Sequence, residues 1–255
     1  MLEEIKTFFG VGNIYEKRID VIQYSVNTAR DLGRLIDHFD KYLLITQKQA
    51  DYLLFKKAID LINNKEHLSI KGLHQIISIK HSINKGLSSE LKAAFPEIIP
   101  IERPIVNITD IQDPNWLSGF TSAEGSFILA IRKSSNSKLG SRVQLIFSLA
   151  QHYRDERLIK SLINYLDCGT FSQYKEGVYF KITKFSDICT KIIPFFNKYP
   201  IHGVKYKDYL DFVKIKNLME SKFHLTEEGL NIIIEIQSGM NRTRRDHIIL
   251  RKEND

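Results

Sequence analysis

The chain has 255 residues, 43% of them hydrophobic, and a formal net charge of +7. This size allows one large domain or two ordinary ones with separate cores, and the positive charge favours a polyanionic partner. No apolar run approaches the ~18 residues of a membrane span, and two cysteines cannot form a disulfide framework, so we exclude a membrane partner and expect an intracellular protein with reduced cysteines.

The first part of the chain alternates between helical and strand periods. The pattern predicts a helix, a hairpin and three more helices, over residues 2–9, 13–27, 29–38, 47–63 and 69–83 in turn. The next segment, 94–112, contains three prolines, which helices cannot accommodate in their interior, so we predict an extended linker there. The linker separates an N-terminal part, residues 1–93, from a C-terminal part, residues 113–255.

The stretch that begins at Asp113 changes its period partway. Asp113 as N-cap and Pro114 at the first helical position predict a helix, and Gly119 in its middle suggests a close contact with another helix. The helix is expected to end near Glu124, and from Ser126 the period is that of a strand. A carboxylate thus lies at the negative end of a helix dipole, which indicates a bound cation and therefore a metal.

In the rest of the chain, apolar residues recur with the helical period in some segments and with the strand period in others. The pattern predicts strands over 126–133, 142–150, 169–174 and 178–183, and helices over 154–166, 185–197, 205–219 and 226–238. Together with the helix over 114–124, this order predicts an α+β fold in which helices cover one face of an antiparallel sheet.

The sequence repeats at an offset of 157 residues. The matching pairs include Gly12 and Gly169, Lys48 and Lys205, Asp51-Tyr52-Leu53 and Asp208-Tyr209-Leu210, and Asn84 and Asn241. At this offset the counterparts of the helix over 114–124 and of the hairpin after it would fall before Met1. We therefore predict two pseudo-symmetric αββαββα repeats, the first of which lacks its first helix and first hairpin.

Residues 116–127, with the sequence WLSGFTSAEGSF, resemble the signature helix of the LAGLIDADG homing endonucleases. Further matches to this family lie at 137–145, 151–155 and 203–209. The chain is thus similar to the two-repeat, monomeric type of the family, with an N-terminally truncated first repeat. A mis-called start, a separate exon and a decayed gene would each explain such a truncation.

The resemblance implies a catalytic set. Glu124 matches the family's catalytic acid and would bind Mg²⁺ or another divalent cation, and Gln151 matches the glutamine that positions the attacking water. Lys205, and Lys48 as its repeat partner, match basic residues that stabilise charge on the phosphate. Taken singly, these side chains would be interpreted as solvated surface groups. The resemblance also implies that two signature helices pack together, through residues Leu117, Gly119 and Phe120.

Polar residues alternate with apolar ones along the predicted strands. A solvated sheet face shows this pattern, but with the resemblance we favour a DNA-contacting face, because a two-stranded ribbon fits the major groove. The loop 134–138 and the basic segment 242–245 are expected to contact phosphates. In the C-terminal repeat the predicted DNA-contacting residues are Ser126, Ile128, Ala130, Arg132, Arg142, Gln144, Ile146, Ser148, Thr170, Ser172, Tyr174, Tyr179, Lys181 and Thr183. In the N-terminal repeat they are Asn13, Tyr15, Lys17, Gln23 and Ser25.

The implied function is a site-specific, divalent-metal-dependent endonuclease that cleaves a long asymmetric target in double-stranded DNA, encoded by an intron and located in mitochondria. Two alternatives stay open: an RNA-binding intron maturase, and a truncated, non-catalytic DNA-binding remnant, since one of the two expected acids is absent. Association with a missing N-terminal segment, or with a second copy of the chain, would supply that acid.

Overall fold

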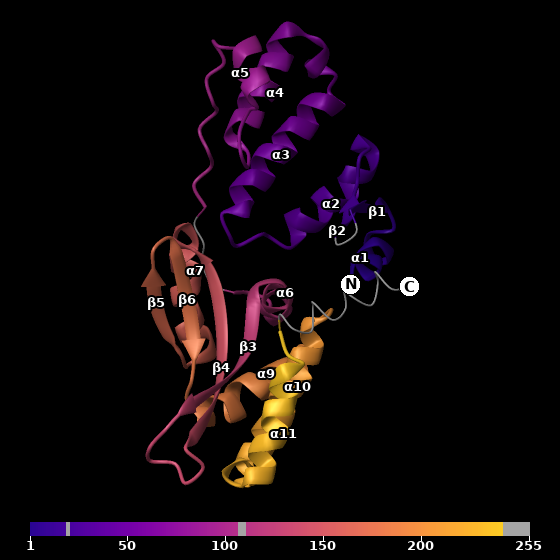
Figure 1. The fold of residues 1–255 in the computed structure, drawn as a ribbon. Coiled ribbons are helices and arrows are strands. Elements are labelled where there is room, and N and C mark those ends of the chain that lie inside the picture. Colours follow the sequence, from indigo (N-terminus) through magenta and orange to yellow (C-terminus); the bar gives the residue numbers. More distant parts are fainter. Residues whose placement is uncertain (19–20, 107–110, 242–255) are drawn as a thin grey trace. The chain divides into compact units, whose positions relative to one another are not determined.

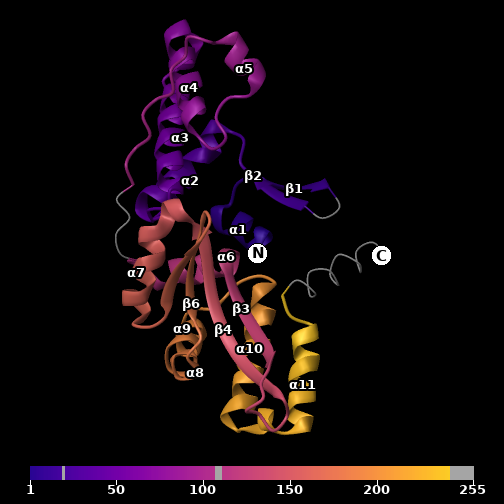
Figure 2. The same ribbon diagram turned by 60° about the vertical axis from the view of Figure 1, so that its left-hand side comes forward.

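The computed structural model describes residues 1–18, 21–106 and 111–241 (Figures 1 and 2). The chain divides into two compact units, Met1–Thr109 and Asp110–Asp255, called unit 1 and unit 2 below. This division falls within 94–112, the segment for which we predict a linker. Among the described helices, none has the length and apolarity that crossing a bilayer requires. Cys168 and Cys189 are both free.

Unit 1 combines one hairpin with several helices. Its elements are α1 (Leu2–Phe9), β1 (Asn13–Arg18), β2 (Val21–Ser25), α2 (Ala29–Lys41), α3 (Lys48–Asn63), η1 (Glu66–Leu68), α4 (Ile70–Ser82) and α5 (Ser89–Ala94). Thr28, Ser69 and Ser88 cap α2, α4 and α5 by accepting a backbone N–H bond. The predicted helices and hairpin are all present. The short α5 was not predicted, because six residues are too few to show a helical period.

Unit 2 contains a four-stranded antiparallel sheet of order β3-β4-β6-β5. Its strands are β3 (Gly125–Lys133), β4 (Ser141–His152), β5 (Thr170–Tyr174) and β6 (Gly177–Ile182). Its longer helices are α6 (Pro114–Glu124), α7 (Glu156–Leu166), α9 (Ile193–Lys198), α10 (Lys205–Glu220) and α11 (Glu227–Ser238). Short helical segments complete it: η2 (Tyr153–Asp155), α8 (Phe185–Asp187), η3 (Ile188–Ile192) and η4 (Phe223–Leu225). The predicted α+β fold is confirmed.

The core of unit 2 lies between one face of this sheet and the helices. Phe127 of β3 is fully buried, and its ring centroid lies 5.4 Å from that of Phe147, 5.7 Å from that of Phe196 and 5.3 Å from that of Phe212. Asn241 Nδ2 donates to the Phe127 carbonyl at 3.0 Å. The strand that follows α6 is therefore anchored from α9, α10 and the segment just after α11.

The sequence repeat is also a repeat of contacts. The Tyr52 hydroxyl lies 3.0 Å from the Ile36 carbonyl oxygen and 2.7 Å from Asp40 Oδ1. The Tyr209 hydroxyl, 157 positions later, makes the equivalent contacts with the Ile193 carbonyl oxygen at 3.1 Å and Asn197 Oδ1 at 2.7 Å. In both units this tyrosine holds the start of one long helix (α3 or α10) against the helix before it.

Tyr209 should make unit 2 sensitive to alkali. Burial raises the pKa of its hydroxyl to about 12, and Tyr206 adds to the effect. Because this folded-state pKa exceeds the ordinary value near 10, the stabilisation is complete below about pH 10 and is lost as the pH rises toward 12. In denaturant titrations followed by fluorescence of Trp116, which is in unit 2 and is the chain's single tryptophan, we expect a loss on the order of 2 kcal/mol over this range. Tyr209→Phe should lower the stability at neutral pH and flatten this alkaline loss; an unchanged slope would contradict the assignment.

Candidate catalytic site and nucleic-acid interface

Helix α6 delivers Glu124 to the start of strand β3. Asp113 Oδ1 accepts the Asn115 N–H at 2.8 Å and Pro114 occupies the first turn, so the helix begins where the sequence predicts. It ends at Glu124, and the next residue has to be glycine, because a Cβ at Gly125 would lie 2.5 Å from the Thr121 side chain and 2.7 Å from its carbonyl oxygen. Only glycine allows the backbone to turn into β3 directly after Glu124, whose side chain is exposed.

The residues predicted to pack against a second signature helix lie on different sides of α6. Leu117 is fully buried, whereas Gly119 is exposed, and among the described residues no atom outside its own stretch of helix lies within 4 Å of the position a Cβ would take. Phe120 is half-buried and stacks on Trp116, with ring centroids 4.7 Å apart. The side of the helix that carries Gly119 and Phe120 is therefore the one open to a further helix.

Lys205 and Gln151 lie at the same end of the sheet as Glu124. Lys205 begins α10, and its Nζ donates to the carbonyl of Ala123 at 2.9 Å. This carbonyl belongs to the last turn of α6, where an ammonium offsets the negative end of the helix. Gln151 lies near the end of β4, two residues past Leu149, the register partner of Gly125. Three predicted catalytic residues from three separate elements are thus brought together.

Lys48 occupies the equivalent position in unit 1, as the first residue of α3. Its Nζ donates to Asp51 Oδ2 at 3.2 Å and to Asn84 Oδ1 at 2.8 Å, while Arg103 Nη1 donates to Asp51 Oδ1 at 2.7 Å. Burial alone would raise the pKa of Asp51, but the bonds from Arg103, the Asn84 N–H and Lys48 together hold it below its usual value. The sequence repeat did not reveal Arg103, because its counterpart would fall beyond the last residue.

The outward face of the unit 2 sheet carries the predicted DNA-contacting residues in cross-strand rows. Arg132 and Arg142 are exposed register partners, and like charges directly opposite each other destabilise a sheet unless an anion neutralises them. Ser148 shares this face but is only 7% exposed. The other register pairs on this face are Ala130 with Gln144, Ile128 with Ile146, Ser126 with Ser148, Ser148 with Lys181, Lys181 with Thr170, Tyr179 with Ser172, and Tyr179 with Ala150. Tyr174 and Thr183, near the ends of the β5–β6 hairpin, are exposed.

The hairpin of unit 1 groups its polar residues in the same way. Asn13 is the register partner of Ser25, and Tyr15 is that of Gln23, whose Nε2 donates to Ser25 Oγ at 2.7 Å. Lys17 is exposed at an irregularity between Glu16 and Arg18. The loop 134–138 is a turn with exposed positions, and the segment 242–245 lies outside the described residues.

The described part of the chain also limits where a metal could bind. It contains no group of three or more His, Cys, Asp or Glu side chains placed to hold an ion. A metal site at Glu124 would therefore rest on fewer than three such side chains of the described residues, which fits Mg²⁺ because this ion commonly takes one or two carboxylates and completes its shell with phosphate oxygens and water.

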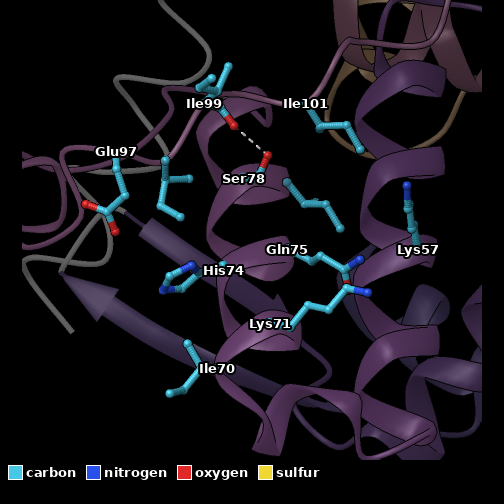
Figure 3. A pocket seen from close by; sticks show the side chains of 11 residues that line it. Lys57, Ile70, Lys71, His74, Gln75, Ser78, Glu97, Ile99 and Ile101 are labelled. Carbon is cyan, nitrogen blue, oxygen red and sulfur yellow. Dashed lines mark hydrogen bonds between the residues drawn. The ribbon is translucent and has the colours of Figure 1, made fainter.

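A hollow in unit 1 is unrelated to the predicted site (Figure 3). It lies between α3, α4 and the segment 97–101, and Ser78 Oγ on its wall donates to the Ile99 carbonyl at 2.6 Å. Isoleucines form much of its lining, and it contains neither a predicted catalytic residue nor a predicted DNA-contacting residue. We assign no chemistry to it.

Several curated relatives of the chain are probable intron-encoded endonucleases by name. The probable intron-encoded endonuclease 3 of Neurospora crassa is 47% identical over 228 residues, which cover 88% of this chain and 43% of the relative. The probable intron-encoded endonuclease 2 of the same organism is 38% identical over 232 residues, which cover 86% of this chain and 50% of the relative. The chain thus spans about half the length of these curated relatives.

Solved structures and a family model agree with this similarity. The I-SmaMI LAGLIDADG homing endonuclease bound to cleaved DNA matches with a TM-score of 0.93 and 48% identity, over 95% of this chain and 82% of the other. The LAGLIDADG meganuclease I-CpaMI bound to uncleaved DNA matches with a TM-score of 0.91 and 44% identity, over 94% and 84%. The family model for LAGLIDADG endonucleases matches residues 1–59 and 117–216. As the motif at 116–127 indicated, the chain belongs to the LAGLIDADG endonuclease family.

Proposed function

We propose that the protein is a site-specific, divalent-metal-dependent endonuclease that cleaves a long, asymmetric target in double-stranded DNA. The observation that carries this proposal is the junction of α6 and β3, where the exposed Glu124 leads directly into a strand whose outward face carries cationic and hydrogen-bonding side chains. The DNA complexes named for its structural relatives support it.

The side chains at this junction have complementary roles. Glu124 would supply one ligand to a divalent cation, Mg²⁺ in our proposal, and such a cation activates water and stabilises charge on phosphate oxygens. Lys205 is held next to Glu124 by the Ala123 carbonyl, where its ammonium would stabilise the negative charge that develops on the phosphate. Gln151 would orient the attacking water through its amide. Lys48 would play the part of Lys205 in unit 1.

The outward strand face would provide affinity and specificity. Arg132, Arg142 and Lys181 would neutralise phosphates or bind guanine edges, and the loop 134–138 would contact the backbone. The names of the curated relatives, one of them a protein in ND4 intron 1 of Podospora anserina that is 46% identical over 69 residues, also support an intron origin and a mitochondrial location.

Cleavage assays with two versions of the chain would test the function. We would incubate the chain with a library of duplexes and Mg²⁺, beside a version that carries an added copy of residues 113–158 ahead of Leu2, which joins in register because Leu2 corresponds to Ile159 at the offset of 157. We expect sequence-specific cutting that stops when the cation is chelated, and faster cutting by the version with two acidic helices, because charge must be stabilised on both the attacking and the leaving oxygen. Sequence-specific binding without cutting by either version would instead support a non-catalytic DNA-binding protein, and preferential binding of intron RNA would support a maturase.

A further inference from the structure

An apolar pair interrupts the polar face of the unit 2 sheet. Ile128 on β3 and Ile146 on β4 are register partners on the outward face, and both are partly exposed. Their chain neighbours Leu129 and Leu145 point the other way and are 6% and 1% exposed, so they belong to the core. A sheet face that meets only water commonly carries polar residues at such positions.

The pair lies in a two-stranded ribbon. β4 pairs with β6 only from Phe147 to His152, so within the described sheet the stretch from Ile128 to the hairpin tip consists of β3 and β4 alone. Its inner side is held by α11, since Gln237 Nε2 donates to the Leu129 carbonyl at 3.0 Å. A two-stranded ribbon has the right width to enter the major groove of DNA.

Groups that suit a polyanion flank the pair on both sides. Arg132 and Arg142 lie opposite each other, four residues from Ile128 and Ile146 toward the hairpin tip, and both are exposed. In the other direction, Ser126 pairs with Ser148, beside which lies the exposed Lys181. The two isoleucines are therefore an apolar spot within a surface of cations and hydrogen-bond donors.

We propose that Ile128 and Ile146 contact the 5-methyl group of thymine in the major groove and thereby select thymine at one or two positions of the target. This inference rests on the proposed function. Thymine is the only base with an apolar group on its major-groove edge, and against isoleucine the donors and acceptors of the other bases would lose hydrogen bonds. Because uracil lacks this methyl group, the pair would also favour DNA over RNA.

The strand geometry gives the approximate position of this thymine. Ile128 follows Glu124 by four residues, or roughly 13 Å along a strand at 3.3 Å per residue. At 3.4 Å per base pair, this is roughly four base pairs. The selected thymine is expected about three to five base pairs from the cleaved bond, on the unit 2 side of the target.

Deoxyuridine substitution tests the contact, because it removes only the methyl group. Duplexes that the full chain retains from a random library would first define its bound sequence, and each thymine in it would then be replaced by deoxyuridine. We expect binding to weaken about fourfold at one or two neighbouring positions in the stated window. If the chain retains no preferred sequence, the proposed function fails; if it does, but no thymine in this window responds, only the present inference is overturned.

Combining one protein substitution with the deoxyuridine substitution separates a DNA contact from a structural role. Ile146→Thr keeps the β-branched shape that favours a strand and replaces the ethyl group of the side chain by a hydroxyl. If Ile146 has only a structural role, the variant should bind thymine and deoxyuridine duplexes more weakly by the same factor. If Ile146 contacts the methyl group, the fourfold preference for the thymine duplex should disappear in the variant. Ile22→Thr is the matched control, because Ile22 is exposed on β2 opposite Glu16, away from the face of Tyr15 and Gln23, and should leave the difference unchanged. The proposal is wrong if the difference survives in both Ile128→Thr and Ile146→Thr.

Discussion

Glu124→Gln should lower the rate of DNA cleavage by more than about 100-fold, the scale seen when one group that stabilises charge in a transition state is removed. The amide has nearly the shape of the carboxylate but is a far weaker ligand for a hard cation. Glu124 is exposed at a helix end and packs into no core, so the variant should fold normally. Single-turnover cleavage of the selected target, with Mg²⁺ in excess, would measure the effect.

DNA binding should respond in the opposite direction. Without divalent cations, Glu124→Gln removes a negative charge next to a polyanion, so we expect affinity to stay constant or to rise slightly. Glu235→Gln provides a control with the same charge change, since Glu235 is an exposed residue of α11, and it should leave the cleavage rate unchanged. Loss of binding that parallels the loss of cleavage in Glu124→Gln would show that this residue holds the structure rather than the cation.

The sequence predicted most of the helices and strands because local signals and the internal repeat point to the same elements. Asp113, Pro114 and Gly125 bound α6 by mechanisms that act within one turn of chain, and the alternation along β3 and β4 fixes which residues face the core. Helix α5 was missed because its boundaries depend on the cap at Ser88 rather than on an apolar period.

Contacts between distant segments were harder to predict. The pairing of Lys205 with the Ala123 carbonyl, and of Arg103 with Asp51, depends on how segments far apart in sequence come together, and no hydrophobic period encodes that.

The family motif also grouped Leu117 with Gly119 and Phe120, although residues two apart on a helix point in different directions. The structure accordingly buries Leu117 and leaves Gly119 open.

Phe212→Ala and Phe55→Ala should have very different effects, although the two residues are repeat partners. Phe212 is fully buried and its ring centroid lies 5.3 Å from that of Phe127, whereas Phe55 is 36% exposed. We expect Phe212→Ala to lower the free energy of unfolding of unit 2 by about 3–5 kcal/mol, and Phe55→Ala to cost about 1 kcal/mol or less in unit 1. The difference arises because β3 covers the aromatic cluster in unit 2, while no equivalent strand is described in unit 1.

Trp116 allows unit 2 to be measured separately, since the chain has a single tryptophan. Phe212→Ala should shift the denaturant midpoint of the Trp116 fluorescence. Phe212→Leu should shift it less, because it leaves a smaller cavity, and Phe55→Ala should leave this transition in place. Phe212→Ala should also slow cleavage by the folded protein, because Phe127 anchors the strand that begins directly after Glu124. Equal costs for Phe212→Ala and Phe55→Ala would mean that β3 does not close the core of unit 2, and that Glu124 is positioned by α6 alone.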